Sequence, residues 1–249
     1  MSYQGKHYWI IGASSGIGAA LAREMAARGA RLALSARRAD ELRALADALS
    51  PAHLALPLDV TEAEPLRKAA AAVQEAFGRI DGVIVMSAVY TPASVEEMDM
   101  QAARQIVDVN LTGTLNCLHA ALPVLRAQGA GQIALCGSVA GYRGLPKAQP
   151  YGATKAAIIN LAESLRLEMA GSGIDVRLIS PGFVRTPMTD KNNFDMPSIV
   201  TPEEAARRIA DGLCGRSFEI HFPRRFTWQM KLLRLLPDAL YFALLRKIT

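Results

Sequence analysis

The sequence contains few of the residue types that bind metals or form disulfides. Its three cysteines and four histidines lie far apart and form no Cys-x-x-Cys or Cys/His cluster: Cys117, Cys136, Cys214, His7, His53, His119 and His221. We therefore predict neither a disulfide framework nor a metal site. Proteins without disulfides are typical of reducing compartments, so we expect a cytoplasmic location.

Long apolar runs are also missing. The chain has 249 residues and 51% hydrophobic content, yet no run approaches the ~20 apolar residues that span a bilayer. The segment HYWIIGA after Lys6 is too short for a secretory signal. Linkers, internal repeats and low-complexity segments are absent as well, so we expect one main domain.

Excess charge is confined to the C-terminal end. The net charge is +5, and residues 223–249 alone hold six basic side chains and one acidic side chain. The preceding residues hold 22 of each sign. A nucleic-acid-binding domain usually carries a basic patch in its body, so the sequence does not indicate nucleic acid as a partner.

Short apolar runs alternate with longer helical patterns. Seven continuous runs read as strands buried on both faces: residues 8–12, 31–36, 53–58, 81–88, 131–138, 175–181 and 217–222. Helical stretches include residues 18–29 and 39–49, and a third begins at Thr201, where a cap, Pro202 and Glu204 mark a start. This alternation predicts an α/β protein with a parallel sheet between two helical layers, whose ligands bind beyond the carboxyl ends of the strands.

A glycine-rich loop, GASSGIG at residues 12–18, follows the first predicted strand. Gly12, Gly16 and Gly18 permit a tight turn, close approach of a phosphate and tight helix–strand packing. The spacing is G-x3-G-x-G rather than the general G-x-G-x-x-G, and a turn without a ligand is the alternative. Between a strand and a helix, we interpret the loop as a dinucleotide-binding turn.

Two arginines end the second strand, in the place where dinucleotide folds often carry an acid for the ribose 2′-hydroxyl. Arg37 and Arg38 would instead attract a 2′-phosphate. This pattern favours NADP over NAD, although two solvated arginines at a helix start would look the same.

Four further residues are candidate catalytic residues when they are considered together. Tyr151 and Lys155 in PYGATKAAI are one helical turn apart, Ser138 precedes them in CGSVAG, and Asn110 lies in VDVNLTG. Taken singly, each has a structural explanation: Tyr151 and Lys155 as a pair on a helix surface, Ser138 as a helix cap, and Asn110 as a polar residue of a helix.

Together with the glycine loop, these motifs resemble the short-chain dehydrogenase/reductase (SDR) family over about residues 6–222. LDV is similar to the family motif that places Asp59 near the adenine, and PGFVRT is similar to its nicotinamide-side loop. The resemblance implies a single-domain, Rossmann-type, doubly wound parallel sheet of about seven strands in a homo-oligomeric oxidoreductase. The residues expected to bind NADP are Gly12, Ser14, Ser15, Gly16, Ile17, Gly18, Arg37, Arg38, Asp59, Val60, Ala88, Tyr151, Lys155, Pro181, Gly182, Val184 and Thr186.

The chain departs from the family pattern at two places. Ile11 precedes the glycine loop where the family commonly has threonine, and MSAV at residues 86–89 replaces Asn-Asn-Ala-Gly while keeping Ala88. We expect weaker hydrogen bonding at this sheet edge and added bulk from Val89 near the cofactor ribose.

The expected reaction is hydride transfer between NADP and a carbonyl compound or secondary alcohol. A nearby lysine cation lowers the pKa of a phenol, so Tyr151 would exchange the proton while Ser138 holds the substrate oxygen. By resemblance, Lys155 also binds the ribose and Asn110 holds a water that relays protons. The alternative is a non-catalytic NADP-binding redox sensor or scaffold. A sugar epimerase is disfavoured because little sequence follows the sixth strand.

The segment TDKNNFDMPSIV, residues 189–200, is predicted to cover the site as a lid. Its apolar side chains are Phe194, Met196, Ile199 and Val200. They favour an apolar or lipid-like substrate, or else pack within the lid itself.

We divide the chain into a catalytic domain, residues 1–222, and a basic amphipathic helical tail, residues 223–249. The tail places Leu232, Leu233, Leu236, Leu240 and Ala243 on one side, and Pro237 is predicted to separate two short helices. Its basic and aromatic residues suit a helix in an anionic membrane surface, and the alternative is packing on its own domain or across an oligomer interface.

Overall fold

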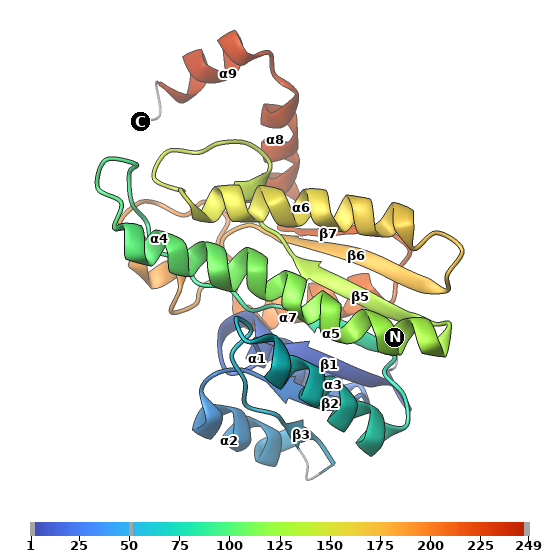
Figure 1. Cartoon of the computed structure of the whole chain (residues 1–249). Coiled ribbons are helices and arrows are strands. Elements are labelled where there is room, and N and C mark those ends of the chain that lie inside the picture. Colours follow the sequence, from blue (N-terminus) through green and yellow to red (C-terminus); the bar gives the residue numbers. More distant parts are fainter. Residues whose placement is uncertain (1–2, 50–51, 247–249) are drawn as a thin grey trace.

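The computed structural model describes residues 3–49 and 52–246, and within them seven parallel strands form one sheet (Figure 1). The strand order is β3-β2-β1-β4-β5-β6-β7. The strands are β1 (His7–Ile11), β2 (Arg31–Ser35), β3 (Leu54–Ala55), β4 (Gly82–Val85), β5 (Gly131–Cys136), β6 (Ile174–Pro181) and β7 (Glu219–Phe222). The order reverses between β1 and β4, which confirms the predicted doubly wound Rossmann-type sheet.

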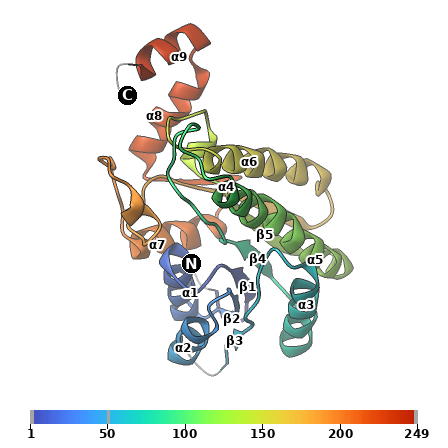
Figure 2. The same cartoon turned by 60° about the vertical axis from the view of Figure 1, so that its left-hand side comes forward.

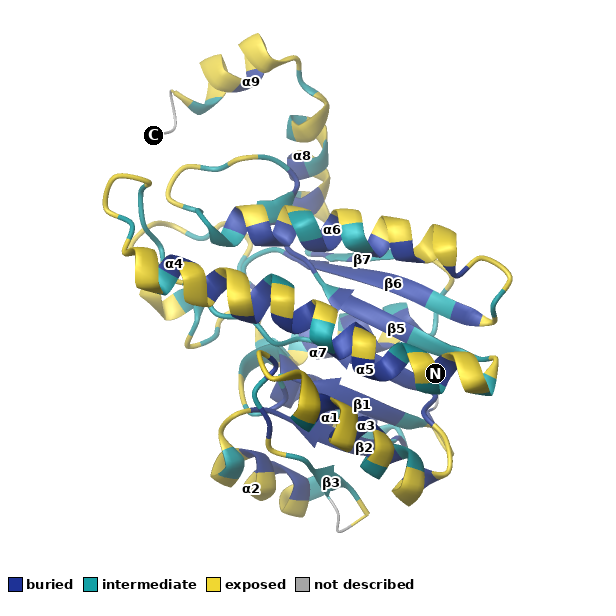
Figure 3. Cartoon of the chain, in the orientation of Figure 1, coloured by how far each residue is buried: buried dark blue, intermediate teal, exposed yellow. Residues whose placement is uncertain are grey.

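Helices cover both faces of the sheet (Figure 2). One layer holds α1 (Gly16–Ala27), α2 (Ala39–Leu49) and α7 (Pro202–Leu213). The other holds α3 (Ala63–Phe77), α4 (Met100–Val107), α5 (Gly113–Gln128) and α6 (Tyr151–Glu168), with a π-helical turn, Asp108–Thr112, between α4 and α5. Figure 3 shows most of β1, β2, β4 and β6 buried between these layers, which is why their sequences read as continuous apolar runs.

The helix starts follow local rules. At α7, the Thr201 hydroxyl accepts a hydrogen bond from the backbone N–H of Glu204 at 3.2 Å, and Pro202 opens the helix. This confirms the predicted cap. The start of α1 has no such side-chain cap, so its first N–H groups face the loop at residues 12–15 and remain available to an anion.

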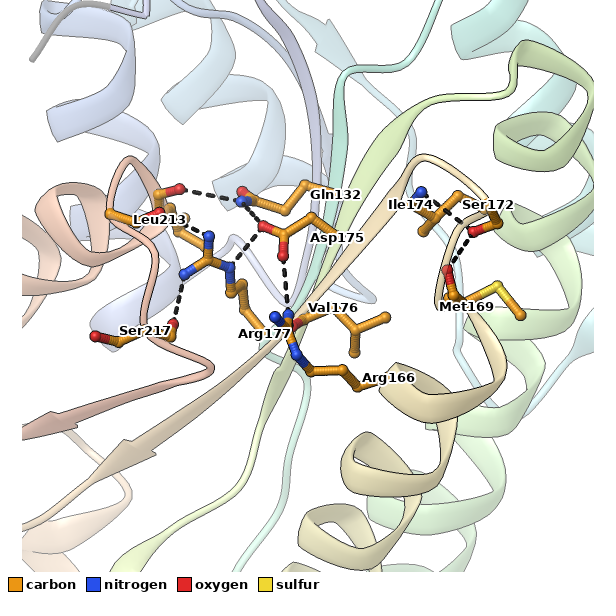
Figure 4. A network of polar contacts seen from close by, with 11 residues as sticks. Gln132, Arg166, Met169, Ser172, Ile174, Asp175, Val176, Arg177, Leu213 and Ser217 are labelled. Atoms are coloured by element: carbon orange, nitrogen blue, oxygen red, sulfur yellow. Dashed lines mark hydrogen bonds and ion pairs between the residues drawn. The ribbon is translucent and has the colours of Figure 1, made fainter.

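A charged network fixes β6 to its surroundings (Figure 4). Asp175 accepts hydrogen bonds from Gln132 of β5 at 2.9 Å, Arg166 of α6 at 3.0 Å and Arg177 at 2.6 Å. Arg177 is buried and also donates to the carbonyl oxygens of Gly215 and Ser217, before β7. The network therefore joins both helical layers at the end of the sheet where the strands begin, opposite their carboxyl ends.

Two helices follow β7: α8 (Arg224–Leu235) and α9 (Asp238–Leu245). They meet at Pro237, so the predicted break is confirmed. Thr227 and Met230 of α8 are buried, and Met230 joins the core beneath α3, α5 and α6. Figures 1 and 2 both show α9 standing away from the body of the molecule.

Candidate active site

A cavity of about 580 Å³ opens at the carboxyl ends of the strands. It brings together residues predicted from separate motifs: Gly12, Ser14, Ser15, Gly16, Ile17, Gly18, Arg37, Arg38, Val60, Ala88, Ser138, Tyr151, Lys155, Pro181, Gly182, Val184 and Thr186. Two predicted residues, Asp59 and Asn110, do not line it. Asp59 lies in an adjoining hollow beside Arg37, and Asn110 is buried behind Val89.

The glycine loop has the shape that a bound pyrophosphate requires. A Cβ on Gly12 would lie 2.5 Å from the backbone nitrogen of Ser87, and one on Gly18 would lie 2.1 Å from the Gly12 carbonyl oxygen. Gly16 has φ +55, which favours glycine, and a Cβ there would lie 3.2 Å from the Thr186 side chain. The loop and the start of α1 thus form a cradle that fits a dinucleotide phosphate.

Basic groups stand at the part of the cavity that follows β2. Arg38 donates a hydrogen bond to the Ser14 hydroxyl at 3.1 Å and pairs with Glu41 at 3.3 Å. Arg37 lies 3.9 Å from a carboxylate oxygen of Asp59. Both arginine side chains are about half exposed, so they can reorient toward a ligand, and Ser14 adds a neutral donor between them.

Tyr151 begins α6 beside the end of β5. Its ring centroid lies 5.5 Å from the Lys155 ammonium, which donates a hydrogen bond to the Cys136 carbonyl oxygen at 2.7 Å. Lys155 is only 2% exposed. The Ser138 hydroxyl accepts a bond from the backbone N–H of Ala140 at 3.1 Å, so it is both the cap of a short helix and a cavity-lining group. One turn of α6 thus holds a phenol and an ammonium in one cavity.

Burial dominates the electrostatics of this pair. It raises the pKa of Tyr151, whereas the hydrogen bond with Ser138 acts to lower it. Burial also lowers the pKa of the Lys155 ammonium. The net direction at Tyr151 is therefore opposite to the lowering that we expected from the neighbouring lysine, because desolvation of the phenolate is the largest contribution.

Asn110 holds the segment that carries the unusual MSAV motif. Its side-chain oxygen accepts from the Val89 backbone N–H at 2.8 Å, and its amide donates to the Val89 carbonyl oxygen at 3.0 Å and to Thr154 at 3.2 Å. The Met86 backbone N–H also donates to the Ile11 carbonyl oxygen at 2.7 Å. The Ser87 hydroxyl is buried against the cavity without a partner among the described residues.

Several residues of the site escaped the sequence reasoning. The Tyr90 ring packs edge-on against Tyr151, with centroids 5.0 Å apart, and its hydroxyl donates to Asn192 at 3.0 Å. The Thr189 hydroxyl donates to the Val184 carbonyl and accepts from the Thr186 N–H, which shapes the turn after β6. Tyr90 follows the carboxyl end of β4, so the rule for parallel sheets could have found it.

The predicted lid lies over this end of the cavity. Lys191 donates a hydrogen bond to the Tyr90 carbonyl oxygen at 3.1 Å. Phe194 packs against Phe183 with ring centroids 5.9 Å apart, and Val200 is buried. Part of the lid's apolar surface therefore packs on the protein itself.

The comparisons with known proteins agree with this arrangement. The family model for short chain dehydrogenases matches residues 6–197. An uncharacterized oxidoreductase of Myxococcus xanthus is 32% identical over 242 residues, which cover 96% of each chain. An uncharacterized oxidoreductase of Mycobacterium tuberculosis is 36% identical over 193 residues, covering 75% of this chain and 76% of the relative.

Solved structures share the fold at low sequence identity. A short chain dehydrogenase/reductase from Burkholderia phymatum in complex with NAD superposes with a TM-score of 0.85, at 23% identity, over 93% of this chain and 94% of that one. A 3-ketoacyl-(acyl-carrier-protein) reductase from Brucella melitensis complexed with NADH superposes with a TM-score of 0.81. The sequence identity is again 23%, and the match covers 90% of this chain and 99% of that one.

Proposed function

The chain belongs to the short-chain dehydrogenase family, and we propose that it is an NADP-dependent oxidoreductase that interconverts a carbonyl compound and a secondary alcohol. One observation carries the proposal: Ser138, Tyr151 and Lys155 line the same cavity as the glycine loop. A proton donor and a dinucleotide cradle in one cavity are what a hydride-transfer enzyme requires.

The preference for NADP rests on this chain's own side chains. Two solved relatives are described with NADH or NAD. Here, Arg37, Arg38 and Ser14 stand where the ribose of the adenosine half would lie, and they offer two guanidinium groups and a hydroxyl to a 2′-phosphate.

The chain's own groups provide the proton chemistry, while a bound nicotinamide would supply or accept the hydride. Ser138 would donate a hydrogen bond to the substrate oxygen, and Tyr151 would protonate that oxygen as it gains negative charge. Burial keeps the Tyr151 phenol protonated, which favours carbonyl reduction. The buried Lys155 ammonium would then stabilise the negative charge left on Tyr151.

Asn110 would act as a positioning residue, because its side chain is engaged by the Val89 backbone; its expected role in holding a relay water stays a prediction. Apolar side chains of Met86, Val89 and Met188 line the cavity, which supports an apolar substrate.

The test is NADPH consumption with a panel of ketones that includes long-chain acyl compounds. We expect Tyr151→Phe to reduce kcat by about 10²- to 10⁴-fold, because it removes only the general acid, and to leave NADPH binding nearly unchanged. Tyr90→Phe is the matched control, since it keeps the ring contact and loses only the bond to Asn192. Near-native turnover by Tyr151→Phe would refute the mechanism. NADPH binding without turnover of any ketone or alcohol would favour the sensor or scaffold.

A further inference from the structure

Exposed apolar side chains gather on α8 and α9. Twelve large apolar side chains are exposed among the described residues, and half of them lie within this short segment. We call this group the tail face; it consists of Trp228, Leu232, Leu235, Leu240, Phe242 and Leu244. Leu235 is 79% exposed and Leu232 is 62% exposed, so these side chains have no cover on the protein itself.

The tail face includes residues of both helices. On α8, Trp228, Leu232 and Leu235 recur at the spacing of one helical stripe. On α9, DALYFALL is apolar almost all round, yet only Tyr241 is buried. A helix of that composition is normally covered. In Figure 3, most of α9 has the colour of exposed residues, and the helix lies away from the sheet.

Positive charge without a carboxylate partner lies on the same two helices as the tail face, within the described residues. Arg224, Arg225, Arg234 and Arg246 have no carboxylate within 4.0 Å among the described residues, whereas Lys231 pairs with Glu219 at 2.5 Å. The single acid of the tail, Asp238, is bonded to Arg143. The sequence adds Lys247, which lies outside the described residues.

We propose that the tail face docks the protein on an anionic lipid surface. Such a surface offers an apolar layer for the leucines and negative headgroups for the arginines at the same time. A second copy of the same face would offer these arginines no anionic partner, because the one acid of the tail, Asp238, is already paired with Arg143. No helix among residues 3–49 and 52–246 has the length and apolar content needed to cross a bilayer, so the helices would lie in the interface.

The tail face is fixed to the segment that precedes Tyr151. Arg143 donates hydrogen bonds to the carbonyl oxygens of Leu233 at 3.1 Å and Leu236 at 2.6 Å, and its guanidinium lies 3.8 Å from the Tyr241 ring centroid. The Tyr241 hydroxyl bonds to the Gly144 carbonyl oxygen. Docking would therefore orient the cavity as well as the tail.

A second contact joins α8 to the loop after β6. The Phe226 ring lies 5.6 Å from that of Phe183, which in turn contacts Phe194 of the lid. The lid and the segment before Tyr151 would thus face the same lipid surface from which an apolar substrate could enter.

The fluorescence of Trp228 provides a direct measurement of docking. The only other tryptophan, Trp9, is 0% exposed, whereas Trp228 is 56% exposed. Full-length protein is mixed at low salt with vesicles of phosphatidylcholine and phosphatidylglycerol, or of phosphatidylcholine alone. We expect a blue shift of tryptophan emission and co-flotation with the anionic vesicles, and the loss of both at high salt.

Point substitutions on the exposed face are the appropriate variants, because truncation would also remove buried Met230. Leu232→Gln with Leu235→Gln should weaken vesicle binding at least about tenfold, and each of Arg224→Gln and Arg225→Gln about fivefold. Leu167→Gln on α6, equally exposed at 79%, and Arg207→Gln on α7 are the matched controls and should leave binding unchanged.

Two results would overturn the proposal. One is wild-type protein that neither floats with anionic vesicles nor shifts its emission at low salt. The other is a lower oligomeric state of the Leu232→Gln, Leu235→Gln variant in analytical ultracentrifugation without any vesicle binding by wild type, which would assign the tail face to a second copy. Vesicle binding requires no turnover, so this test is independent of the enzyme assay.

Discussion

Tyr151 is subject to two opposing effects, since burial raises the pKa of its phenol and the hydrogen bond with Ser138 lowers it. Burial is the larger, so the cofactor-free protein should form the Tyr151 phenolate only above the range of an ordinary tyrosine, near ~10. The measurement is an ultraviolet absorbance titration of wild type against Tyr151→Phe. Ser138→Ala should move the transition still higher. A tyrosinate that appears near neutral pH and is absent from Tyr151→Phe would show that Lys155 outweighs burial.

The two arginines after β2 should decide which cofactor binds. Arg37→Ala or Arg38→Ala removes a charged hydrogen bond to a 2′-phosphate, worth about 1.5–3 kcal/mol, so KM for NADPH should rise roughly 10- to 100-fold. KM for NADH should change little, because NADH has no such group. Arg43→Ala is the control, since Arg43 is an exposed arginine of α2 outside the cavity lining. Equal effects on both cofactors would place Arg37 and Arg38 away from the 2′ position.

Residues that sit in contiguous motifs could be predicted from the sequence, and those that depend on distant contacts could not. Gly12, Ser138 and Tyr151 each follow a strand or begin a helix, so short-range patterns located them. Tyr90 follows the carboxyl end of β4, which marks its position, but its ring contact with Tyr151 depends on the fold. The direction of the Tyr151 pKa shift depends on burial in the folded protein, which a sequence motif does not contain.

At the scale of elements, the apolar runs located all seven strands but not their lengths. The third run, residues 53–58, forms only the two-residue β3, although Leu56 and Leu58 still donate backbone hydrogen bonds to β2 and its extension. Pro57 lies between them, and because β3 is the edge strand its missing N–H faces away from β2 and removes no hydrogen bond to it. The fourth run also ends early, because the chain leaves β4 at Met86 to line the cavity.

The network at Asp175 should make the stability of the sheet depend on pH. Burial acts to raise the pKa of Asp175, but hydrogen bonds from Gln132 and Arg177 outweigh it and hold the pKa below the ordinary 3.8. A lowered pKa in the folded state contributes stability above the unfolded value and loses it as pH falls through the folded value. Asp175→Asn should therefore lower the free energy of unfolding at neutral pH, and the difference from wild type should shrink below about pH 4.

Urea denaturation at several pH values measures this effect. Asp175 is 36% exposed, so we expect a moderate loss of about 1–2 kcal/mol at neutral pH. Asp40→Asn is the control: its carboxylate is fully exposed beside Arg43, and it should change stability little at any pH. If the difference in unfolding free energy between Asp175→Asn and wild type stays constant at acidic pH, the carboxylate charge does not contribute to stability.

At the scale of the whole molecule, cofactor binding and folding should be linked, because the cavity draws its walls from the segments after β1 to β6 and exists only in the folded chain. A ligand present at about 100 times its Kd adds roughly 2.7 kcal/mol, which raises Tm by about 5–10 °C for a domain of this size. NADP should give a larger rise than NAD at equal concentration.

Substitutions at two glycines distinguish an effect on cofactor binding from an effect on backbone strain. Gly16 (φ +55) lines the cavity, and Gly78 (φ +74) ends α3 with open space around it. Gly16→Ala and Gly78→Ala should both lower the Tm of the free protein, since alanine disfavours the left-handed region. Only Gly16→Ala should also reduce the rise in Tm with NADP, because its methyl group enters the phosphate cradle and approaches Thr186 to 3.2 Å. An equal NADP-dependent rise in both variants, measured by thermal unfolding, would place the dinucleotide outside the glycine loop.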